Sequence, residues 1–423
     1  MIVEIRAENA FIFNEKVVFS LEADMRTKKF VSNVCSFGNF NIVKVAGIYG
    51  PNNVGKTNLI KCIRAIIEVL LNKGFKINRN LFSKSNIVSL GISFIFENRF
   101  FSYDFKYDVK KEECVYEMFA EVTKDSSGNK IKDRWLERDV ANAKPLYAKD
   151  EKMRNILGMV ARNNILIHLV NTEHFEYIKE MKRVLTSFAE KVDVVDMNNI
   201  PIQKTIDVLK SKNSICDKMV NFIKNADLYM DDFYFADAKQ LKIVPFHDNS
   251  KPQENVLDDL PEELVEKMRL TSVYKGKPFP ALLFDSTGTK KIASLASYII
   301  DALEKGRILI VDELDSSIHF KLARAVVAMF NNELNDKAQL IFTVHDVTLM
   351  DCQKLFRKEQ IWFVHKDSTG VYLYSLAEFS AKDGIRNTSD LVAKYKKGVL
   401  GALPEPELIN SLLEIHSKEV PNE

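Results

Sequence analysis

Hydrophobic and polar residues in the first third of the chain predict strands interrupted by a single helix. Alternation over residues 2–6 and a short apolar run over 17–21 indicate two strands. The run 42–49 is apolar almost throughout, which is typical of a strand buried on both faces. Apolar residues then recur at helical spacing over 56–72, and alternation broken by polar turns over 87–122 predicts an antiparallel β-meander.

The rest of the chain divides into a helical segment and an alternating one. Residues 150–270 show helical periodicity interrupted by prolines, with amphipathic stretches over 155–170, 175–191, 202–212 and 214–226. Beyond them strands alternate with helices that end near Lys305 and Asn332. The strands are expected at ALLFDS, RILIVDE, QLIFTV, QIWFV and VYLYSL. This alternation predicts a mostly parallel sheet.

Composition excludes several classes of protein. The 423 residues carry 60 basic and 58 acidic side chains, so the net charge of +2 creates no whole-chain attraction to DNA or to a membrane. No window is apolar enough for a membrane span, and the N-terminus lacks the pattern of a signal peptide. The cysteines are scattered without a CxxC pair, which argues against disulfides and a zinc site and favours a cytoplasmic location.

The segment GPNNVGKT fits the phosphate-binding pattern GxxxxGK[ST] completely. It follows an apolar strand and opens a helix, and both its backbone amides and the helix N-terminus attract an anion. Lys56 is expected to reach the β- and γ-phosphates of ATP, and Thr57 to hold Mg²⁺. The predicted nucleotide-binding residues of this loop are Gly50, Pro51, Asn52, Asn53, Val54, Gly55, Lys56, Thr57 and Asn58.

Two carboxylates end the apolar strand RILIVDE, and they predict the hydrolytic half of the site. Asp312 is expected to order Mg²⁺ through water, and Glu313 to polarise the attacking water. A core strand that ends in solvated acids has the same pattern, so this assignment depends on the phosphate-binding loop elsewhere in the chain. The two motifs together predict a P-loop ATPase.

The segment FDSTGT precedes the helix that leads into RILIVDE. It is similar to the signature loop of ABC and SMC heads, in which a serine and a glycine bind the γ-phosphate held by the other subunit. Ser286 and Gly288 are the corresponding residues here. A plain helix N-cap at Ser286 or Thr287 is compatible with the same pattern.

Two more motifs follow the predicted catalytic glutamate. Asp315, in LDSS, matches the D-loop of that class and is expected to contact nucleotide. His345, in FTVHD, comes one helix and one strand later and resembles the switch histidine that contacts the γ-phosphate. With Lys56 and Glu313, this histidine completes the predicted catalytic set.

These motifs resemble those of AAA/ABC-type ATPases of bacterial anti-phage (abortive-infection) systems, which are related to OLD-family and SMC/RecF-like heads. The resemblance covers nearly the whole chain. It rests on the segments ENAF, GPNNVGKTN, WLERD, DSTGTKK in place of the LSGGQ form, VDELDSSIH, FTVHD and GALP. It implies an α/β fold of the ABC/SMC-head P-loop NTPase type, with an antiparallel β-meander and a helical insertion.

The resemblance also implies an organisation and partners. Residues 1–149 would form the N-terminal half of the ATPase head, 150–275 the helical insertion, and 276–423 the C-terminal half. The protein is expected to close as a homodimer, or a higher oligomer, around ATP and Mg²⁺. It would sense infection and gate a separate effector such as a nuclease, without membrane contact. Nucleic-acid contact stays open: the basic stretch 73–84 suits it, and equally suits a solvated loop.

The chain departs from the family pattern in two places. No glutamine suits the loop that supplies a Mg²⁺ ligand or sensor in ABC ATPases, because Gln203, Gln240 and Gln253 lie in or after the helical segment. The clustered acids of the OLD nuclease are also missing, since the pairs at 231–232 and 258–259 are typical of solvated faces. We therefore expect no nuclease activity from this chain itself.

Other functions fit parts of the pattern. A DNA-repair head of the SMC/RecF kind would share the ATP-site motifs, but the proline-interrupted helical segment lacks a long heptad arm. The ATPase subunit of a transporter would carry a much smaller insertion. A GTPase is disfavoured because HKD at 365–367 has the wrong spacing for a guanine-binding motif.

Overall fold

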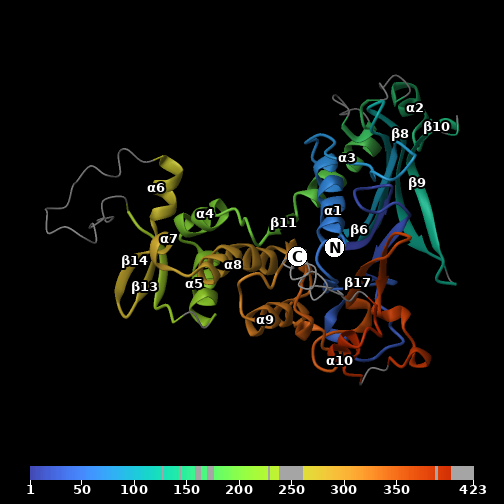
Figure 1. The fold of residues 1–423 in the computed structure, drawn as a ribbon. Coiled ribbons are helices and arrows are strands. Elements are labelled where there is room, and N and C mark those ends of the chain that lie inside the picture. The colour runs from blue at the N-terminus through green and yellow to red at the C-terminus, as the bar shows by residue number, and fades with distance from the viewer. Residues whose placement is uncertain are drawn as a thin grey trace, which may run out of the picture.

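The protein has a main body built on two large β-sheets and a smaller lobe that projects from it (Figure 1). The computed structural model describes residues 1–125, 127–140, 142, 144–157, 163–168, 176–226, 229–237, 261–385 and 389–401. Outside the described residues lie Gln240, Gln253, Asp258, Asp259, the ALP of the late GALP segment and part of the stretch 155–170.

The nucleotide-binding motifs are carried by a six-stranded sheet in which every strand but β18 runs parallel, as predicted. Ile308 and Ile310 face one hydrophobic core and Leu309 and Val311 the other, so both faces are covered and the strands are apolar throughout. The order is β11 (Val192–Asp196), β15 (Ile308–Asp312), β16 (Gln339–Thr343), β5 (Val45–Tyr49), β17 (Ile361–Lys366) and β18 (Val371–Ser375).

The second sheet confirms and extends the predicted meander, and with it the mixed α/β class. Helix α1 (Lys56–Leu70) packs between the two sheets, and α3 (Glu176–Ala189) also packs on the second, where Phe188 stacks on Phe94 at 3.9 Å between ring centroids. The antiparallel strands of the second sheet lie in the order β10 (Lys144–Ala148), β9 (Lys130–Asp139), β8 (Glu113–Lys124), β7 (Arg99–Asp108), β6 (Ile87–Phe96), β1 (Ile2–Glu8) and β2 (Val17–Ser20).

Gln339 joins the two sheets. Its buried amide accepts the N–H of Ile2 at 2.7 Å and donates to the carbonyl oxygens of Ile2 and Val43 at 3.0 and 3.1 Å. A buried amide with these bonds satisfied fixes β1 against the parallel sheet. The loop after β1 is thereby held beside the phosphate-binding loop, where Ile12 lies against Gly55.

The projecting lobe is formed by the chain between β11 and β15, and it has a hydrophobic core of its own. Helix α8 (Thr287–Lys305) belongs to both parts, because Ala296 faces the core of the lobe and Leu295 the core of the main body. The other elements of the lobe are α4 (Gln203–Ser211), α5 (Ser214–Asn225), α6 (Glu262–Met268), α7 (Ala281–Phe284) and the sheet of β12 (Asp232–Phe235), β13 (Leu270–Tyr274) and β14 (Lys277–Pro280).

The remaining elements surround the main body. Helix α9 (Phe320–Asn331) shares with α8 the hydrophobic core on one face of the parallel sheet. The others are the hairpin of β3 (Val34–Phe37) and β4 (Phe40–Val43), and the short helices α2 (Glu151–Leu157) and α10 (Leu391–Lys396).

Two secondary-structure predictions are wrong. In ALLFDS, expected as a strand, the first four residues form α7 instead, because an apolar run this short has no decisive period. The segment 150–275, expected to be mostly helical, also contains β11, β12 and β13. β11 is an edge strand of the parallel sheet, so the expected insertion includes one strand of the sheet that carries the nucleotide-binding motifs.

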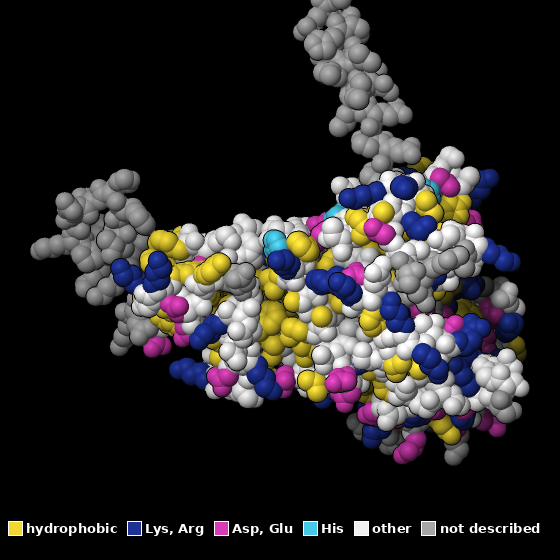
Figure 2. All heavy atoms as spheres, turned by 90° about the horizontal axis from the view of Figure 1, so that it is seen from below, with side chains coloured by type: hydrophobic (Ala, Val, Ile, Leu, Met, Phe, Trp, Pro, Cys, Tyr) yellow, Lys and Arg dark blue, Asp and Glu magenta, His cyan; other side chains and the backbone are white. Residues whose placement is uncertain are grey.

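Hydrophobic side chains gather along the middle of one face, between the projecting lobe and the main body, with both basic and acidic side chains around them (Figure 2). No helix in the described part of the chain is long and apolar enough to cross a membrane.

Candidate nucleotide site

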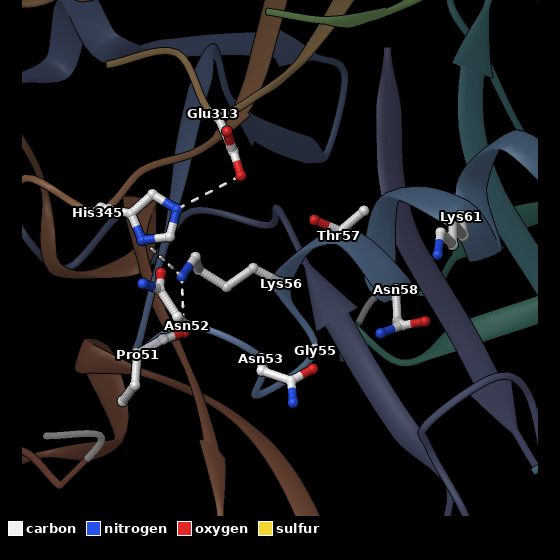
Figure 3. Close-up of a pocket in the computed structure, with 10 residues that line it drawn as sticks. All are labelled: Pro51, Asn52, Asn53, Gly55, Lys56, Thr57, Asn58, Lys61, Glu313 and His345. Atoms are coloured by element: carbon white, nitrogen blue, oxygen red, sulfur yellow. Dashed lines mark hydrogen bonds and ion pairs between the residues drawn. The ribbon is translucent and has the colours of Figure 1, made fainter. Parts of the chain in front are cut away.

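A cavity of about 600 Å³ lies at the carboxyl ends of β5, β15 and β16. These strands are parallel neighbours, so the loops that follow them meet at one edge of the sheet. The predicted catalytic residues Lys56, Glu313 and His345 are thereby brought together (Figure 3). The cavity is lined by Pro51, Asn52, Asn53, Gly55, Lys56, Thr57, Asn58, Lys61, Glu313 and His345.

Backbone geometry explains the glycines of the phosphate-binding loop. Gly55, at the N-cap of α1, has a φ of 118°, and a Cβ there would lie 2.8 Å from the side chain of Ile12. A Cβ at Gly50 would collide with the carbonyl oxygen of Val364 in β17. Gly50 and Val54 shape the loop without lining the cavity, and Val54 is buried beneath it.

Lys56 is buried at the base of the cavity. Its ammonium donates to the carbonyl oxygens of Gly50 and Pro51 at 2.6 and 2.8 Å, and to Nδ1 of His345 at 3.2 Å. Burial lowers the pKa of Lys56 to about 8, although nearby carboxylates act in the opposite direction. An anion bound in the cavity would therefore stabilise the charged form of Lys56.

Thr343 contacts both residues of the second motif. Its hydroxyl donates to Oδ1 of Asp312 and accepts the N–H of Glu313 at 2.7 Å. Glu313 has a φ of 58°, a left-handed conformation that costs on the order of 1–3 kcal/mol for a side chain other than glycine. This turn directs Glu313 into the cavity while Asp312 stays buried behind it.

Asp315 supports the loop that carries His345. Its Oδ2 accepts the backbone N–H groups of His345 and Asp346 at 2.9 and 2.7 Å. Because the ammonium of Lys56 only donates, Nδ1 of His345 is the acceptor and the proton of the neutral ring is on Nε2. Nε2 lies 3.7 Å from Oε1 of Glu313. Asp315, predicted to contact nucleotide, is thus placed behind the histidine and does not line the cavity.

Besides Thr343, two residues of the site were not predicted. Lys61 lines the cavity one helical turn after Thr57, and the i, i+4 spacing on α1 is the signal that points to it. Asn198, in the loop after β11, donates from Nδ2 to Oε2 of Glu313 at 2.8 Å. No motif marks Asn198, because its position depends on the unpredicted strand β11.

Of the glutamines considered for the missing loop, Gln203 is the one in the described chain. It lies in α4, where Nε2 donates to Oδ1 of Asp207 at 2.8 Å. The hydrogen bond to the carboxylate of Glu313 comes from Asn198 instead.

Ser286 and Gly288 lie outside the cavity that holds Lys56. They line a second cavity of about 530 Å³, shared with the D-loop and α9. Ser286 caps α8, since its Oγ accepts a backbone N–H of the first turn at 3.1 Å. A Cβ at Gly288 would collide with the carbonyl oxygen of Ser317, so the signature loop packs directly on the D-loop of the same chain.

The donors present at the first cavity suit Mg²⁺. The Thr57 hydroxyl is turned toward the side where Glu313 lies (Figure 3). Asp312 contributes a carboxylate whose Oδ1 accepts a hydrogen bond from the hydroxyl of Thr343. Hydroxyl and carboxylate oxygens are the ligands that Mg²⁺ takes beside phosphates and water. Within the described ranges, no group of three or more His, Cys, Asp or Glu residues could hold a metal ion on side chains alone.

One family of known proteins matches most of the chain. The family described as "AAA domain, putative AbiEii toxin, Type IV TA system" matches residues 45–351, which include both motifs of the cavity. The chain belongs to this family. No curated protein matches it.

Solved structures similar to this AAA-domain protein include three SMC heads. The SMC head domain from Thermotoga maritima is 12% identical, with a TM-score of 0.42 over 88% of this chain and 98% of that one. An SmcHead bound to the C-winged helix domain of ScpA is 13% identical, with a TM-score of 0.47 over 88% and 97%. A Smc head domain with an extended coiled coil, bound to the C-terminal domain of ScpA derived from Pyrococcus furiosus, is 12% identical, with a TM-score of 0.42 over 90% and 97%.

Proposed function

We propose that this AAA-domain protein is an ATP-hydrolysing molecular switch that dimerises around its nucleotide. The observation that carries the proposal is the convergence of the phosphate-binding loop, Lys56, Glu313 and His345 on one cavity of about 600 Å³. Membership of the AAA-domain family supports nucleotide binding and hydrolysis.

Binding begins with an exchange of partners at Lys56. In the absence of a phosphate its ammonium is satisfied by the carbonyl oxygens of Gly50 and Pro51. When ATP lies along the loop, with its phosphates at the N-terminus of α1, the lysine turns to the β- and γ-phosphates. Thr57, and Asp312 through water, would hold Mg²⁺, which would neutralise charge on the phosphate oxygens.

Hydrolysis then depends on two side chains at the opposite wall. Glu313 orients the attacking water and accepts its proton, with its carboxylate already aimed by the bond from Asn198. His345 carries its proton on Nε2 and donates it in a hydrogen bond to the γ-phosphate as charge develops there. Asp315 keeps the histidine loop in place through two backbone N–H groups.

The position of the signature loop supports the dimer. Ser286 and Gly288 stand at a helix N-terminus, which suits a phosphate, yet they line a cavity separate from that of Lys56. A second copy of the chain would bring its Ser286 to the γ-phosphate held here. The paired sites would then close together and open after hydrolysis, which is the behaviour of a switch.

The biological setting of the proposal is anti-phage defence with a separate effector. The family description names a type IV TA system. The separate effector comes from the resemblance of the sequence motifs. The effector would be a distinct polypeptide, such as a nuclease, because the sequence lacks the clustered acids of the OLD nuclease. Asp232 lies in β12 and Asp231 directly before it, where the carboxylate of Asp231 accepts the N–H of Gly276.

Glu313→Gln is the test of the proposed function. The variant should bind ATP-Mg²⁺ with wild-type affinity, lose about 100-fold or more in turnover, and accumulate as a dimer, because the closed state persists until the γ-phosphate leaves. Light scattering with and without ATP-Mg²⁺ measures the dimer, and phosphate release measures turnover.

Two variants serve as controls. Glu333→Gln makes the same chemical change at an exposed acid after α9 and should behave like wild type. Lys56→Ala should lose ATP binding and therefore show no dimer. Unchanged turnover in Glu313→Gln, or no ATP-dependent dimer, contradicts the proposal. Dimerisation and turnover that require added DNA would favour the DNA-repair alternative.

A further inference from the structure

Asp285 is a buried carboxylate directly before the signature serine. It lies between α7 and Ser286, the N-cap of α8, and is only 7% exposed. A buried carboxylate is costly unless hydrogen bonds compensate for the lost hydration. Its partners therefore indicate what it does for the loop that contains it.

Two hydroxyls of β13 hold this carboxylate. Oδ2 accepts from Oγ of the fully buried Ser272 at 2.6 Å, and Oδ1 accepts from the phenol of Tyr274 at 2.8 Å. Burial raises the pKa of Tyr274 to about 12, with a further contribution from Asp285, so the phenol remains a donor near neutral pH. No Lys or Arg of the described residues forms an ion pair with Asp285, and these neutral donors compensate for its burial.

The other side of the signature loop rests on the D-loop. Besides the contact of Gly288 with Ser317, Nζ of Lys291 in α8 donates to Oγ of Ser316 at 3.0 Å and to Oγ of Ser317 at 3.3 Å. The loop is thus clamped between the D-loop and β13. Asp285 is its attachment on the β13 side.

We infer that Asp285 is a positioning residue through which the sheet β12–β13–β14 sets the place of Ser286 at the nucleotide of a second chain. The inference rests on the proposed function, because Ser286 reaches nucleotide only in the dimer. It predicts that a sheet outside the ATP cavity controls dimer closure and turnover without controlling ATP binding in the single chain.

Tyr274→Phe removes one hydroxyl and keeps the ring. Single-chain affinity for a fluorescent ATP analogue, measured at a dilution that prevents dimers, should stay within about twofold of wild type. Turnover at saturating ATP should fall about tenfold or more, since a misplacement of roughly 1 Å is enough for such losses. Tyr234→Phe is the matched control, because Tyr234 stands on the neighbouring strand β12 and lines a different cavity, of about 610 Å³.

Variants of Asp285 itself sharpen the test. Asp285→Asn keeps the size and one acceptor oxygen, so it should retain more turnover than Asp285→Ala while both keep single-chain ATP affinity. A Tm within a few degrees of wild type for Tyr274→Phe separates positioning from loss of fold. Equal loss of single-chain affinity and turnover in Tyr274→Phe overturns the inference, as does unchanged turnover.

Dimerisation in the Glu313→Gln background distinguishes this inference from the proposed function. ATP should drive Glu313→Gln into dimers, and the added Tyr274→Phe should weaken that dimer about tenfold or more. Failure of Glu313→Gln alone to dimerise refutes the proposed function and with it the inference. A dimer that Tyr274→Phe leaves unchanged refutes the inference alone.

Discussion

The ammonium of Lys56 is held against carbonyl oxygens in a site whose burial lowers its pKa to about 8. Above that pH the lysine loses the charge that attracts phosphate, so ATP affinity should fall by up to about tenfold per pH unit. Calorimetric titration from about pH 7 to about pH 9.5 measures this fall. Lys56→Arg stays charged throughout and should show a flat profile. A flat wild-type profile would contradict the prediction.

The same shift acts on folding stability with the opposite sign. The folded-state pKa of Lys56 lies below its ordinary value of 10.5, so the unfolded chain binds more protons between about pH 8 and 10.5. The contribution of Lys56 to the free energy of unfolding therefore rises with pH across that window. Affinity and stability should move in opposite directions as pH rises, which separates loss of charge from general unfolding.

The role of Thr343 is visible only in the three-dimensional structure. Thr343→Val keeps its shape but removes the hydroxyl that binds Asp312 and the N–H of Glu313, so turnover should fall about 10- to 100-fold. ATP affinity should change little, because Thr343 does not line the cavity. Thr343→Ser, which restores the hydroxyl, should recover most of the turnover measured by phosphate release. Equal turnover in the Val and Ser variants would exclude this role.

Individual residues of the site could be predicted only where a motif is contiguous. The pattern GPNNVGKT predicts the phosphate-binding loop because its eight positions are contiguous in the chain. The contact of Asp315 with nucleotide stays a prediction, and within the chain its Oδ2 accepts the backbone N–H groups of His345 and Asp346. Thr343 and Asn198 were missed because their partners are distant in sequence.

Helices and strands, too, could be predicted only where their signal is local in the sequence. Strands of the parallel sheet with uninterrupted apolar runs, such as β15 and β16, were predicted, since burial on both faces leaves a strong signal. β11 was missed because its sequence, VDVVD, carries acids at its second and fifth positions, a spacing without strand alternation, and lies within a helical stretch. Its position beside β15 comes from pairing across the fold, which no local pattern encodes.

At the scale of elements, a prediction concerns Asn198, in the loop that follows β11. Asn198→Ala removes the bond to Oε2 of Glu313 and should lower turnover about tenfold while ATP affinity is kept. Asn198→Asp puts a second carboxylate against Glu313 and should be worse than alanine, because like charges disfavour the ionised base. Steady-state turnover at saturating ATP ranks the variants. An aspartate variant as active as wild type would show that Asn198 does not act on Glu313.

At the scale of the whole molecule, the two halves of the ATP site come from segments more than 200 residues apart, joined by a lobe that carries the signature loop. The mixed α/β class and the parallel sheet followed from the order of elements along the chain. The spatial relation of the lobe to the sheet did not, because it depends on α8 packing into two cores at once.

The separation of the two cavities predicts that nucleotide is hydrolysed between chains. A Ser286→Arg chain and a Glu313→Gln chain should each be inactive alone. In their heterodimer one site carries both changes and the other carries neither, so random pairing should restore about a quarter of wild-type turnover. Phosphate release after mixing measures the recovery, and differently sized tags report heterodimer formation. Heterodimers that form without regaining activity would place Ser286 and Glu313 at the same chain's nucleotide, or couple the two sites so strictly that one intact site cannot turn over, and either result contradicts the prediction.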